Sequence, residues 1–485
     1  SKKFEKIFEQ IREDGDTSLK TLINLDIDEN RSLRPLDGEE TELKEKVRKR
    51  KDKNKEQGEE EHIIYSWKQL IEEGKNAIAL GDRQFIDAEV LGTDPAVILY
   101  TSGTTGFAKG VVLTHRNIVD DLMMAPTLLK VHPEDIFFSV LPVHHTYECT
   151  CAFLMPLYKG ASIAFCEGLK YITKNLQEIR PTMLLGVPVL IETLYKKIWK
   201  TAKSEGKDKK LEKLMKLNKK TKKLNINIAK KLAKDILDVF GGRMRVLISG
   251  GAAIDPKILQ FFNDLGIIAV QGYGLTECSP MTALNPDVEK DMKNESVGHL
   301  LPGMKVKIVD ADEEGIGEIC FKGPNVMLGY YNNQEATDEV LKDGWFHTGD
   351  LGRVDTDSFI YITGRKKNVI ITENGKNVFP EELEYELSHI PYIAESMVWG
   401  DNEGEGVNST TIAATVTLDD DEVKEVLGEE YTDEQAQNLV WGEIDKINER
   451  LPLFKKIKKL NIRKTDFNKT TGMKIKRFVE SNKDA

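Results

Sequence analysis

One short segment combines hydroxyl side chains, glycines and a lysine in a pattern suited to binding phosphate. Residues 100–110 read Tyr-Thr-Ser-Gly-Thr-Thr-Gly-Phe-Ala-Lys-Gly, and an apolar run that predicts a buried strand precedes them. Glycines let the chain turn sharply so that backbone N–H groups converge on an anion, while Lys109 adds positive charge. The common P-loop requires Ser or Thr directly after its Gly-Lys pair, whereas Gly110 follows Lys109 here. The segment predicts a phosphate-binding loop, with a flexible surface turn as the alternative.

Two further glycine-rich turns also follow predicted strands. The apolar residues 246–249 precede the first turn, and residues 267–270 lead into the second at 271–274. Between them, Asp255 as N-cap and Pro256 in the first turn predict a helix. Because ligand sites of parallel α/β sheets lie beyond the carboxyl ends of the strands, the three turns are expected to share one crevice.

The elements around these turns indicate the fold class. Strands and helices alternate between residues 94 and 274, which predicts parallel sheets covered by helices. After residue 364 shorter strands mix with helices, so we place a domain boundary there. We expect a large α/β N-terminal domain with layered sheets and helices, residues 1–365, and a smaller, mobile α+β C-terminal domain, residues 366–485, with a hinge near 364–370.

Composition limits the protein class. A chain of 485 residues with 40% hydrophobic and 31% charged residues fits a globular protein of at least two domains. A net charge of −11 argues against nucleic acid as the main partner. The five cysteines form no zinc-finger spacing, which predicts a reducing compartment and no structural zinc. With no apolar run of membrane-spanning length, we expect a cytoplasmic protein.

Two charged segments interrupt the pattern. Residues 37–61 contain 18 charged residues of both signs, which favours a solvated loop or exposed helix. Residues 196–234 form a basic amphipathic insertion with sixteen lysines and three acidic residues. This insertion could contact the inner face of a membrane as a peripheral protein does, dock an acidic acyl carrier protein, or be a solvated helical pair.

Further motifs, in a fixed order, carry a family resemblance. They are Gln-Gly-Tyr-Gly-Leu-Thr-Glu at 271–277, Gly-Glu-Ile at 317–319, Gly-Tyr-Tyr at 329–331, Thr-Gly-Asp at 348–350, Gly-Arg-Lys-Lys at 364–367 and Lys-Ile-Lys-Arg at 474–477. With the phosphate loop, this series resembles the adenylate-forming (AMP-binding) enzymes over roughly residues 60–480. Within that superfamily the chain is most similar to the long-chain fatty acyl-CoA synthetases. Members carry more chain before the loop, so we expect an N-terminal portion to be missing.

The resemblance implies an ATP-dependent ligase that joins a fatty acid to CoA through acyl-AMP, with Mg²⁺ as cofactor and CoA as co-substrate. Asp350 would bind the ribose, because a carboxylate offers two oxygens to vicinal hydroxyls, and Arg365 would close over the same sugar. Glu277 would hold Mg²⁺ with Thr101 nearby, since magnesium favours a carboxylate plus phosphate oxygens. The remaining implied nucleotide contacts are Ser102, Gly103, Thr104, Thr105, Gly106 and Lys109 at the β- and γ-phosphates, Thr276 at the α-phosphate, and Gly250, Gly251, Ala252, Tyr273 and Gly274 around the adenine.

The resemblance also assigns the catalytic groups and the acyl pocket. Lys474 would bridge the carboxylate and the α-phosphate, although Met473 stands where the family usually has glycine. Lys367 would be the hinge about which the small domain rotates, and Gly375 would line the pantetheine channel. His145 would sit beside the substrate carboxylate. A further set could form an apolar acyl tunnel or belong to the core: Gly186, Val187, Pro188, Leu190, Leu194, Ile248 and Met281.

Two alternatives to the fatty acid:CoA ligase stay open. The acyl group could pass to acyl carrier protein, for which the basic insertion is the supporting feature. A truncated relative could instead bind nucleotide or acyl chains without turnover. Acyl chain length and oligomeric state are left open by the sequence.

Overall fold

The structure of the chain is a computed structural model. It describes residues 22–24, 31–32, 63–101, 108–221, 238–372, 375–401, 410–469, 475–477, 479 and 483. The charged segment 37–61 lies outside these residues. The chain divides into two compact units, residues 1–90 and 91–485.

The first unit contains a small sheet and one helix. Strand β3 (Ile63–Ser66) pairs with β1 (Leu22–Asn24) in parallel and with β2 (Arg31–Ser32) in antiparallel orientation. Helix α3 (Trp67–Ala79) follows β3 directly.

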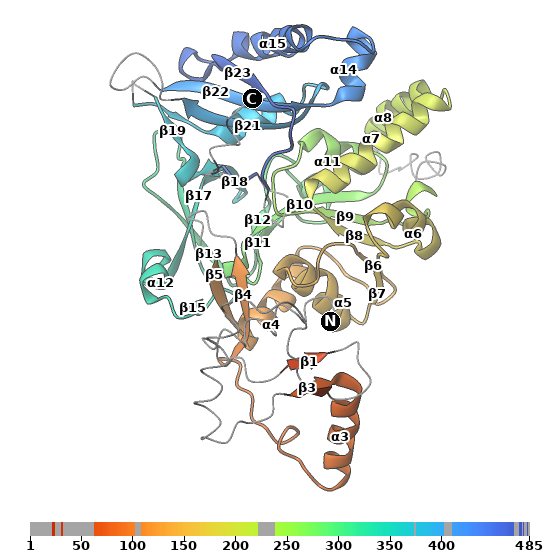
Figure 1. Ribbon diagram of the computed structural model, residues 1–485, viewed down its shortest axis with the longest axis vertical. Coiled ribbons are helices and arrows are strands. Elements are labelled where there is room, and N and C mark those ends of the chain that lie inside the picture. The colour runs from red at the N-terminus through yellow and green to blue at the C-terminus, as the bar shows by residue number, and fades with distance from the viewer. Residues whose placement is uncertain are drawn as a thin grey trace, which may run out of the picture. The chain divides into compact units, whose positions relative to one another are not determined.

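A seven-stranded sheet forms the centre of the second unit (Figure 1). Its order is β12-β11-β10-β9-β8-β6-β7, with β10, β9, β8, β6 and β7 parallel and the β11 and β12 edge antiparallel. The strands are β6 (Ile136–Ser139), β7 (Ser162–Phe165), β8 (Met183–Gly186), β9 (Val246–Ser249), β10 (Ile268–Gly274), β11 (Met281–Leu284) and β12 (His299–Leu300). The predicted parallel sheet is confirmed, and its second predicted strand extends to Gly274.

Alternate residues of the parallel strands face two separate cores. Phe137 of β6 and Ile248 of β9 belong to one hydrophobic cluster, whereas their neighbours Phe138 and Leu247 belong to another. This alternation follows from the two-residue repeat of a strand. Both faces of the sheet are therefore buried, as in other parallel sheets.

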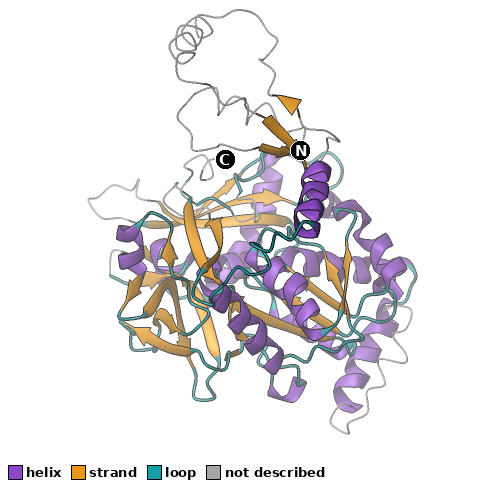
Figure 2. Cartoon of the chain, turned by 90° about the horizontal axis from the view of Figure 1, so that it is seen from below, coloured by secondary structure: helices purple, strands orange, loops and turns teal. Residues whose placement is uncertain are grey.

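Helices lie on both sides of this sheet (Figures 1 and 2). The α-helices of this part are α4 (His115–Met124), α5 (Met155–Lys159), α6 (Ile172–Ile179), α7 (Pro188–Ser204), α8 (Asp208–Thr221) and α11 (Pro256–Asp264). Helix α11 confirms the predicted N-cap, because the Asp255 carboxylate accepts the Lys257 N–H at 2.8 Å. A π-helix, η3 (Tyr147–Leu154), precedes α5. The 3₁₀ turns are η2 (Ala125–Thr127), η4 (Leu169–Tyr171), η6 (Asp238–Phe240), η7 (Thr276–Cys278) and η8 (Glu289–Asp291).

Two further sheets and a short helix complete this region. One has the order β15-β5-β4, formed by β15 (Gly329–Tyr330), β5 (Lys109–Thr114) and β4 (Pro95–Thr101). The other has the order β13-β14-β17-β16, with β18 paired to β17: β13 (Lys305–Val309), β14 (Gly317–Lys322), β16 (Leu341–Lys342), β17 (Trp345–Val354) and β18 (Ile360–Arg365). Helix α12 (Gln334–Val340) lies between β15 and β16 in sequence.

The C-terminal residues form their own core. Strands β21 (Ile393–Asp401), β22 (Thr411–Leu418) and β23 (Lys459–Ile462) pair into one sheet, and β19 (Ile370–Ile371) pairs with β20 (Asn377–Val378). The helices are η9 (Lys366–Asn368), α13 (Pro380–Leu387), α14 (Asp420–Leu427), α15 (Asp433–Arg450) and η10 (Leu453–Lys455). The hydrophobic cluster here draws all its buried members from residues 370–460, which supports a boundary near 365. The boundary stays a prediction.

The described residues of the basic insertion, 196–221, belong to the helical pair α7 and α8. Leu211 of α8 is buried and Met215 packs against the same cluster as α11, so the apolar side of α8 faces the protein. Residues 222–234 of the insertion lie outside the described part. Every helix in the described ranges is too short or too polar to cross a bilayer.

Candidate active site

The carboxylate of Asp350 is held in place from two sheets. Asp350 of β17 lies opposite Arg365 of β18, and the Arg365 Nε is 2.6 Å from the Asp350 Oδ1. The Tyr273 hydroxyl, from the end of β10, donates to the other oxygen, Oδ2. Asp350 is 3% exposed, and the Thr348 hydroxyl oxygen accepts its backbone N–H at 3.0 Å. A buried carboxylate with both oxygens held is fixed in orientation, which suits it to bind a polar ligand.

Tyr273 uses its hydroxyl, whereas the sequence predicted a use for its ring. Burial and the adjacent Asp350 carboxylate raise the pKa of the Tyr273 hydroxyl, so that it remains a proton donor to Asp350. Its ring lies 6.0 Å from that of Phe321. Stacking of Tyr273 on adenine stays a prediction.

A second group of side chains surrounds Glu277. Glu277 lies in η7, directly after β10, and its Oε1 accepts the Tyr330 hydroxyl at 2.8 Å. Within the described part of the chain, the second oxygen of Glu277 has no hydrogen-bond partner. The Lys109 Nζ lies 4.9 Å from the centre of the Tyr330 ring, close enough for a cation–π interaction. Tyr330 thus connects the lysine of the predicted phosphate loop to the predicted metal carboxylate.

Backbone pairing positions Thr101 and Lys109. These residues lie opposite each other where β4 and β5 enter the predicted loop, and Tyr330 of β15 pairs with Val111 two residues further along β5. Of the predicted contacts in this loop, Ser102, Gly103, Thr104, Thr105 and Gly106 lie outside the described residues.

The turn after β9 is adapted to a tyrosine. A side chain at Gly250 would place its Cβ 2.9 Å from the ring of Tyr147, so glycine permits this contact. The Tyr147 hydroxyl donates to the Ile248 carbonyl at 3.1 Å. Gly251 has a φ of +85°, and both it and Ala252 are exposed at the end of the strand. Adenine contact at these three positions stays a prediction.

His145 carries a buried ring nitrogen without a partner. Its Nε2 accepts or donates no hydrogen bond among the described residues, and its ring lies 4.6 Å from that of His144. Burial and the neighbouring His144 lower the pKa of His145, so its ring is neutral near pH 7. A neutral imidazole with a free nitrogen can bind a polar group of a ligand.

The predicted C-terminal residues lie on separate segments. Lys367 is the middle residue of η9, and Gly375 takes a left-handed conformation with a φ of +71° in the turn between β19 and β20. Lys474 lies outside the described residues. Its neighbour Ile475 forms a backbone bridge with Lys469.

Comparison with known proteins identifies the family. A family model described as AMP-binding enzyme matches residues 15–331. The chain belongs to this AMP-binding family. The resemblance inferred from the motifs is confirmed.

Similar proteins include acyl-CoA ligases and solved adenylate-forming enzymes. Long-chain-fatty-acid–CoA ligase FadD15 of Mycobacterium tuberculosis is 30% identical over 82% of this chain and 69% of its own length. Fatty acyl-CoA synthetase A of Dictyostelium discoideum is 33% identical over 71% of this chain, a match that spans about half, 53%, of that relative. ATP-bound MatB from Rhodopseudomonas palustris is 27% identical, with a TM-score of 0.61 over 83% of this chain and 70% of its own. The comparisons place the chain among the ligases of the family and confirm the expected fold class.

The apolar residues named for an acyl tunnel or for the core fall into two separate cores of this AMP-binding enzyme. These cores lie on opposite faces of the seven-stranded sheet, which favours the core alternative over a single tunnel. Ile248 and Met281 line a small apolar void together with Cys151. Leu190 and Leu194 of α7 pack in the cluster on the other face.

Tyr330 is the site residue that sequence reasoning missed. The Gly-Tyr-Tyr motif at 329–331 served to recognise the AMP-binding family, but no function was assigned to its tyrosines. Tyr330 is 9% exposed, whereas Tyr331 is 50% exposed. The strand alternation of β15 could have shown that only one of the two rings faces inward.

Proposed function

We propose that this AMP-binding enzyme is an ATP-dependent fatty acid:CoA ligase. It would convert a fatty acid and ATP into acyl-AMP and pyrophosphate, and then transfer the acyl group to CoA. The proposal rests on two carboxylates that tyrosine hydroxyls orient, Asp350 and Glu277. Asp350 contacts Tyr273 at the end of β10, and Glu277 lies in η7, directly after β10. The names of the curated relatives support the choice of acyl substrate.

Asp350 and Arg365 would bind the ribose of ATP. The Asp350 carboxylate accepts a hydrogen bond from the Tyr273 hydroxyl and forms an ion pair with Arg365, so its orientation is fixed. A carboxylate held in this way could accept hydrogen bonds from the two vicinal hydroxyls of a ribose. Arg365 is 43% exposed, so its guanidinium can contact both Asp350 and a ligand.

The opposite end of ATP would lie against Thr101, Lys109 and Glu277. The paired ends of β4 and β5 hold the loop that would receive the β- and γ-phosphates. Glu277 fits Mg²⁺, because Tyr330 fixes one oxygen while the other has no hydrogen-bond partner among the residues that the structure describes. Bound there, Mg²⁺ would neutralise phosphate charge. Thr276, adjacent to Glu277 in η7, would face the α-phosphate.

The first half-reaction is an in-line displacement at phosphorus. A carboxylate oxygen of the fatty acid forms a bond to the α-phosphorus, and the bond from that phosphorus to the bridging oxygen of pyrophosphate breaks. The positive charge of Lys474 would lie between the carboxylate and the α-phosphate and stabilise the negative charge that develops. The unpaired Nε2 of His145 would hydrogen-bond to the acyl carboxylate.

The second half-reaction transfers the acyl group. The CoA thiolate forms a bond to the acyl carbon, and the bond from this carbon to the AMP oxygen breaks, releasing AMP. Rotation about Lys367 would remove Lys474 and bring Gly375 towards the thiol path. In the left-handed turn at Gly375, a Cβ atom would have no described neighbour within 4 Å, which leaves space beside the backbone for a narrow ligand.

Pyrophosphate release tests the proposal. The chain is incubated with ATP, Mg²⁺ and fatty acids of several lengths, with and without CoA, and acyl-CoA is measured in parallel. We expect release that depends on the fatty acid and thioester that depends on CoA. A Lys474→Ala variant should lose adenylation yet still form thioester from supplied acyl-AMP. If none of the fatty acids causes release of pyrophosphate from ATP, the enzyme proposal is refuted.

A parallel assay with acyl carrier protein in place of CoA tests the alternative acceptor. The described part of the basic insertion gives this alternative no specific support, because Leu211 and Met215 pack inward. If thioester forms on the carrier protein and none forms on CoA, acyl carrier protein is the acceptor in place of CoA.

A further inference from the structure

Three metal-binding side-chain types meet on one face of the five-stranded sheet. Glu318 and Cys320 are two residues apart on β14, and both side chains contact the Nδ1 of His347, so they lie on the same side. His347 of β17 lies directly opposite Cys320 in the antiparallel pair. Cys320 and Glu318 are buried, and the His347 side chain is 16% exposed. Residues far apart in the sequence are thus brought together by strand register.

Two of the three distances between donor atoms match a tetrahedral metal site. The His347 Nδ1 is 3.3 Å from the Cys320 Sγ and 3.4 Å from the Glu318 Oε2, and all three atoms lie within 4.8 Å of one another. Ligand atoms around tetrahedral zinc are about 3.4–3.6 Å apart, from metal–ligand bonds of about 2.0–2.3 Å. The two contacts of His347 are therefore close to two edges of such a tetrahedron.

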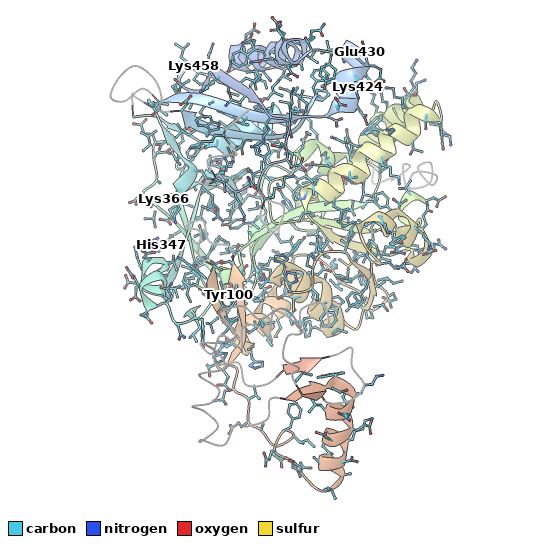
Figure 3. The ribbon with its side chains drawn as sticks, viewed as in Figure 1. Tyr100, His347, Lys366, Lys424, Glu430 and Lys458 are labelled. Atoms are coloured by element: carbon cyan, nitrogen blue, oxygen red, sulfur yellow. The ribbon has the colours of Figure 1, made fainter. Side chains whose placement is uncertain are left out.

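A lysine forms an ion pair with the carboxylate of this cluster. The Lys366 Nζ lies 3.0 Å from the Glu318 Oε2, and the Lys366 side chain is 54% exposed. Lys366 and His347, which both contact this carboxylate oxygen, are labelled in Figure 3. A long, exposed side chain can swing into solvent at small cost. The backbone N–H of Gly349 donates to the other Glu318 oxygen at 3.1 Å, which would orient a ligating carboxylate.

We propose that Glu318, Cys320 and His347 bind a soft divalent cation of the Zn²⁺ type in place of the Lys366 ammonium. Sulfur and imidazole ligands favour Zn²⁺ and Co²⁺ over Mg²⁺ and Ca²⁺, which prefer oxygen. Three protein ligands leave a fourth position for water. Binding releases the thiol proton to solvent, because the thiolate is the ligand.

The ligands of this site are distinct from the residues proposed to bind the nucleotide. An irregularity in the β14–β17 pairing lies between the pair Cys320–His347 and the pair Glu318–Leu351, and Asp350 is instead bonded to Tyr273 and Arg365. The cation does, however, replace a contact of Lys366, the first residue of η9 and the neighbour of the predicted hinge residue Lys367. Metal binding would therefore free the start of this segment from β14. The proposal does not depend on the ligase reaction.

Cobalt titration tests the site. The metal-stripped chain is titrated with Co²⁺, and we expect near-ultraviolet thiolate-to-cobalt absorption together with the visible bands of tetrahedral cobalt, both abolished by Zn²⁺. Cys320→Ser should abolish the thiolate band, and His347→Ala should weaken binding at least tenfold. The matched control Cys166→Ser, at a partly exposed thiol elsewhere, should bind as the unsubstituted chain does.

A gain of affinity distinguishes this site from a merely damaged protein. Lys366→Met removes the competing ammonium and keeps a long side chain, so it should bind Co²⁺ several-fold more tightly. Absence of the thiolate band in the unsubstituted chain, or a band that survives Cys320→Ser, would overturn the proposal. Unchanged or weaker affinity of Lys366→Met would also count against it.

Discussion

Tyr330→Phe should weaken magnesium binding without unfolding the protein. The substitution removes the hydroxyl that donates to the Glu277 Oε1 at 2.8 Å and keeps the ring beneath Lys109. Burial and the Glu277 charge raise the pKa of Tyr330, so the hydroxyl is protonated and donates throughout the working pH range. Its loss leaves one oxygen of the carboxylate without its donor and frees the side chain to rotate.

The structure sets the size of the effect. A hydrogen bond to a charged group contributes about 1.5–3 kcal/mol, and this carboxylate is partly exposed, so the lower value applies. Loss of a residue that orients a metal ligand costs about 10–100-fold in metal affinity. We therefore expect the Mg²⁺ concentration for half-maximal pyrophosphate release to rise about tenfold, with the free energy of unfolding reduced by about 1.5 kcal/mol.

The neighbouring tyrosine provides the control. Tyr331→Phe removes a hydroxyl from a side chain that is 50% exposed, and it should leave both quantities unchanged. Magnesium is varied at saturating ATP, and unfolding is followed in urea. If Tyr330→Phe shifts the magnesium dependence by less than twofold relative to Tyr331→Phe, Tyr330 does not orient Glu277 for the metal.

Three other predictions test separate parts of the structure. Burial raises the pKa of Glu148 to about 7. Between about pH 4.5 and pH 7 the Glu148 carboxyl is therefore protonated in the folded protein but ionised in the unfolded chain. The contribution of this carboxyl to stability is complete below about pH 4.5, and it is lost as the pH rises through 7. Glu148→Gln should therefore be more stable than the unsubstituted chain at pH 8 by up to about 3 kcal/mol, with little difference at pH 4 in the same urea titrations. Asp350→Asn should raise the KM for ATP at least tenfold and lower the free energy of unfolding by about 1–2 kcal/mol. This loss is smaller than that from breaking a fully buried ion pair, because Arg365 is partly exposed. An unchanged KM would show that Asp350 does not bind the nucleotide. Asp255→Ala should lower the free energy of unfolding by about 1–2 kcal/mol, because Asp255 caps α11 and also lies 3.0 Å from the His389 Nε2. His389→Ala keeps the cap and should lower the free energy of unfolding by less than about 1 kcal/mol. Equal losses in these two variants would show that the cap contributes nothing.

Local patterns in the sequence were enough for the elements and for the family. The strand at 246–249 and the N-cap at Asp255 were both predicted, because alternation, apolar runs and capping residues act over a few neighbouring positions. The family motifs also lie in short segments, which is why Glu277, Asp350 and Arg365 could be named as candidates.

Tertiary structure decided how those candidates are used. The Tyr273 hydroxyl meets a carboxylate 77 residues away, and Tyr330 meets Glu277 across 53 residues. The apolar residues named for a tunnel or for the core fall into two cores, because the two faces of one sheet bury different residues. Strand register placed Cys320 opposite His347, although no cysteine spacing predicted a metal site. The sequence by itself determined which local elements form and which family the chain resembles, whereas only the folded sheets decided which side chains meet, since hydrogen bonds and ligand sets depend on distances between segments that no local pattern encodes.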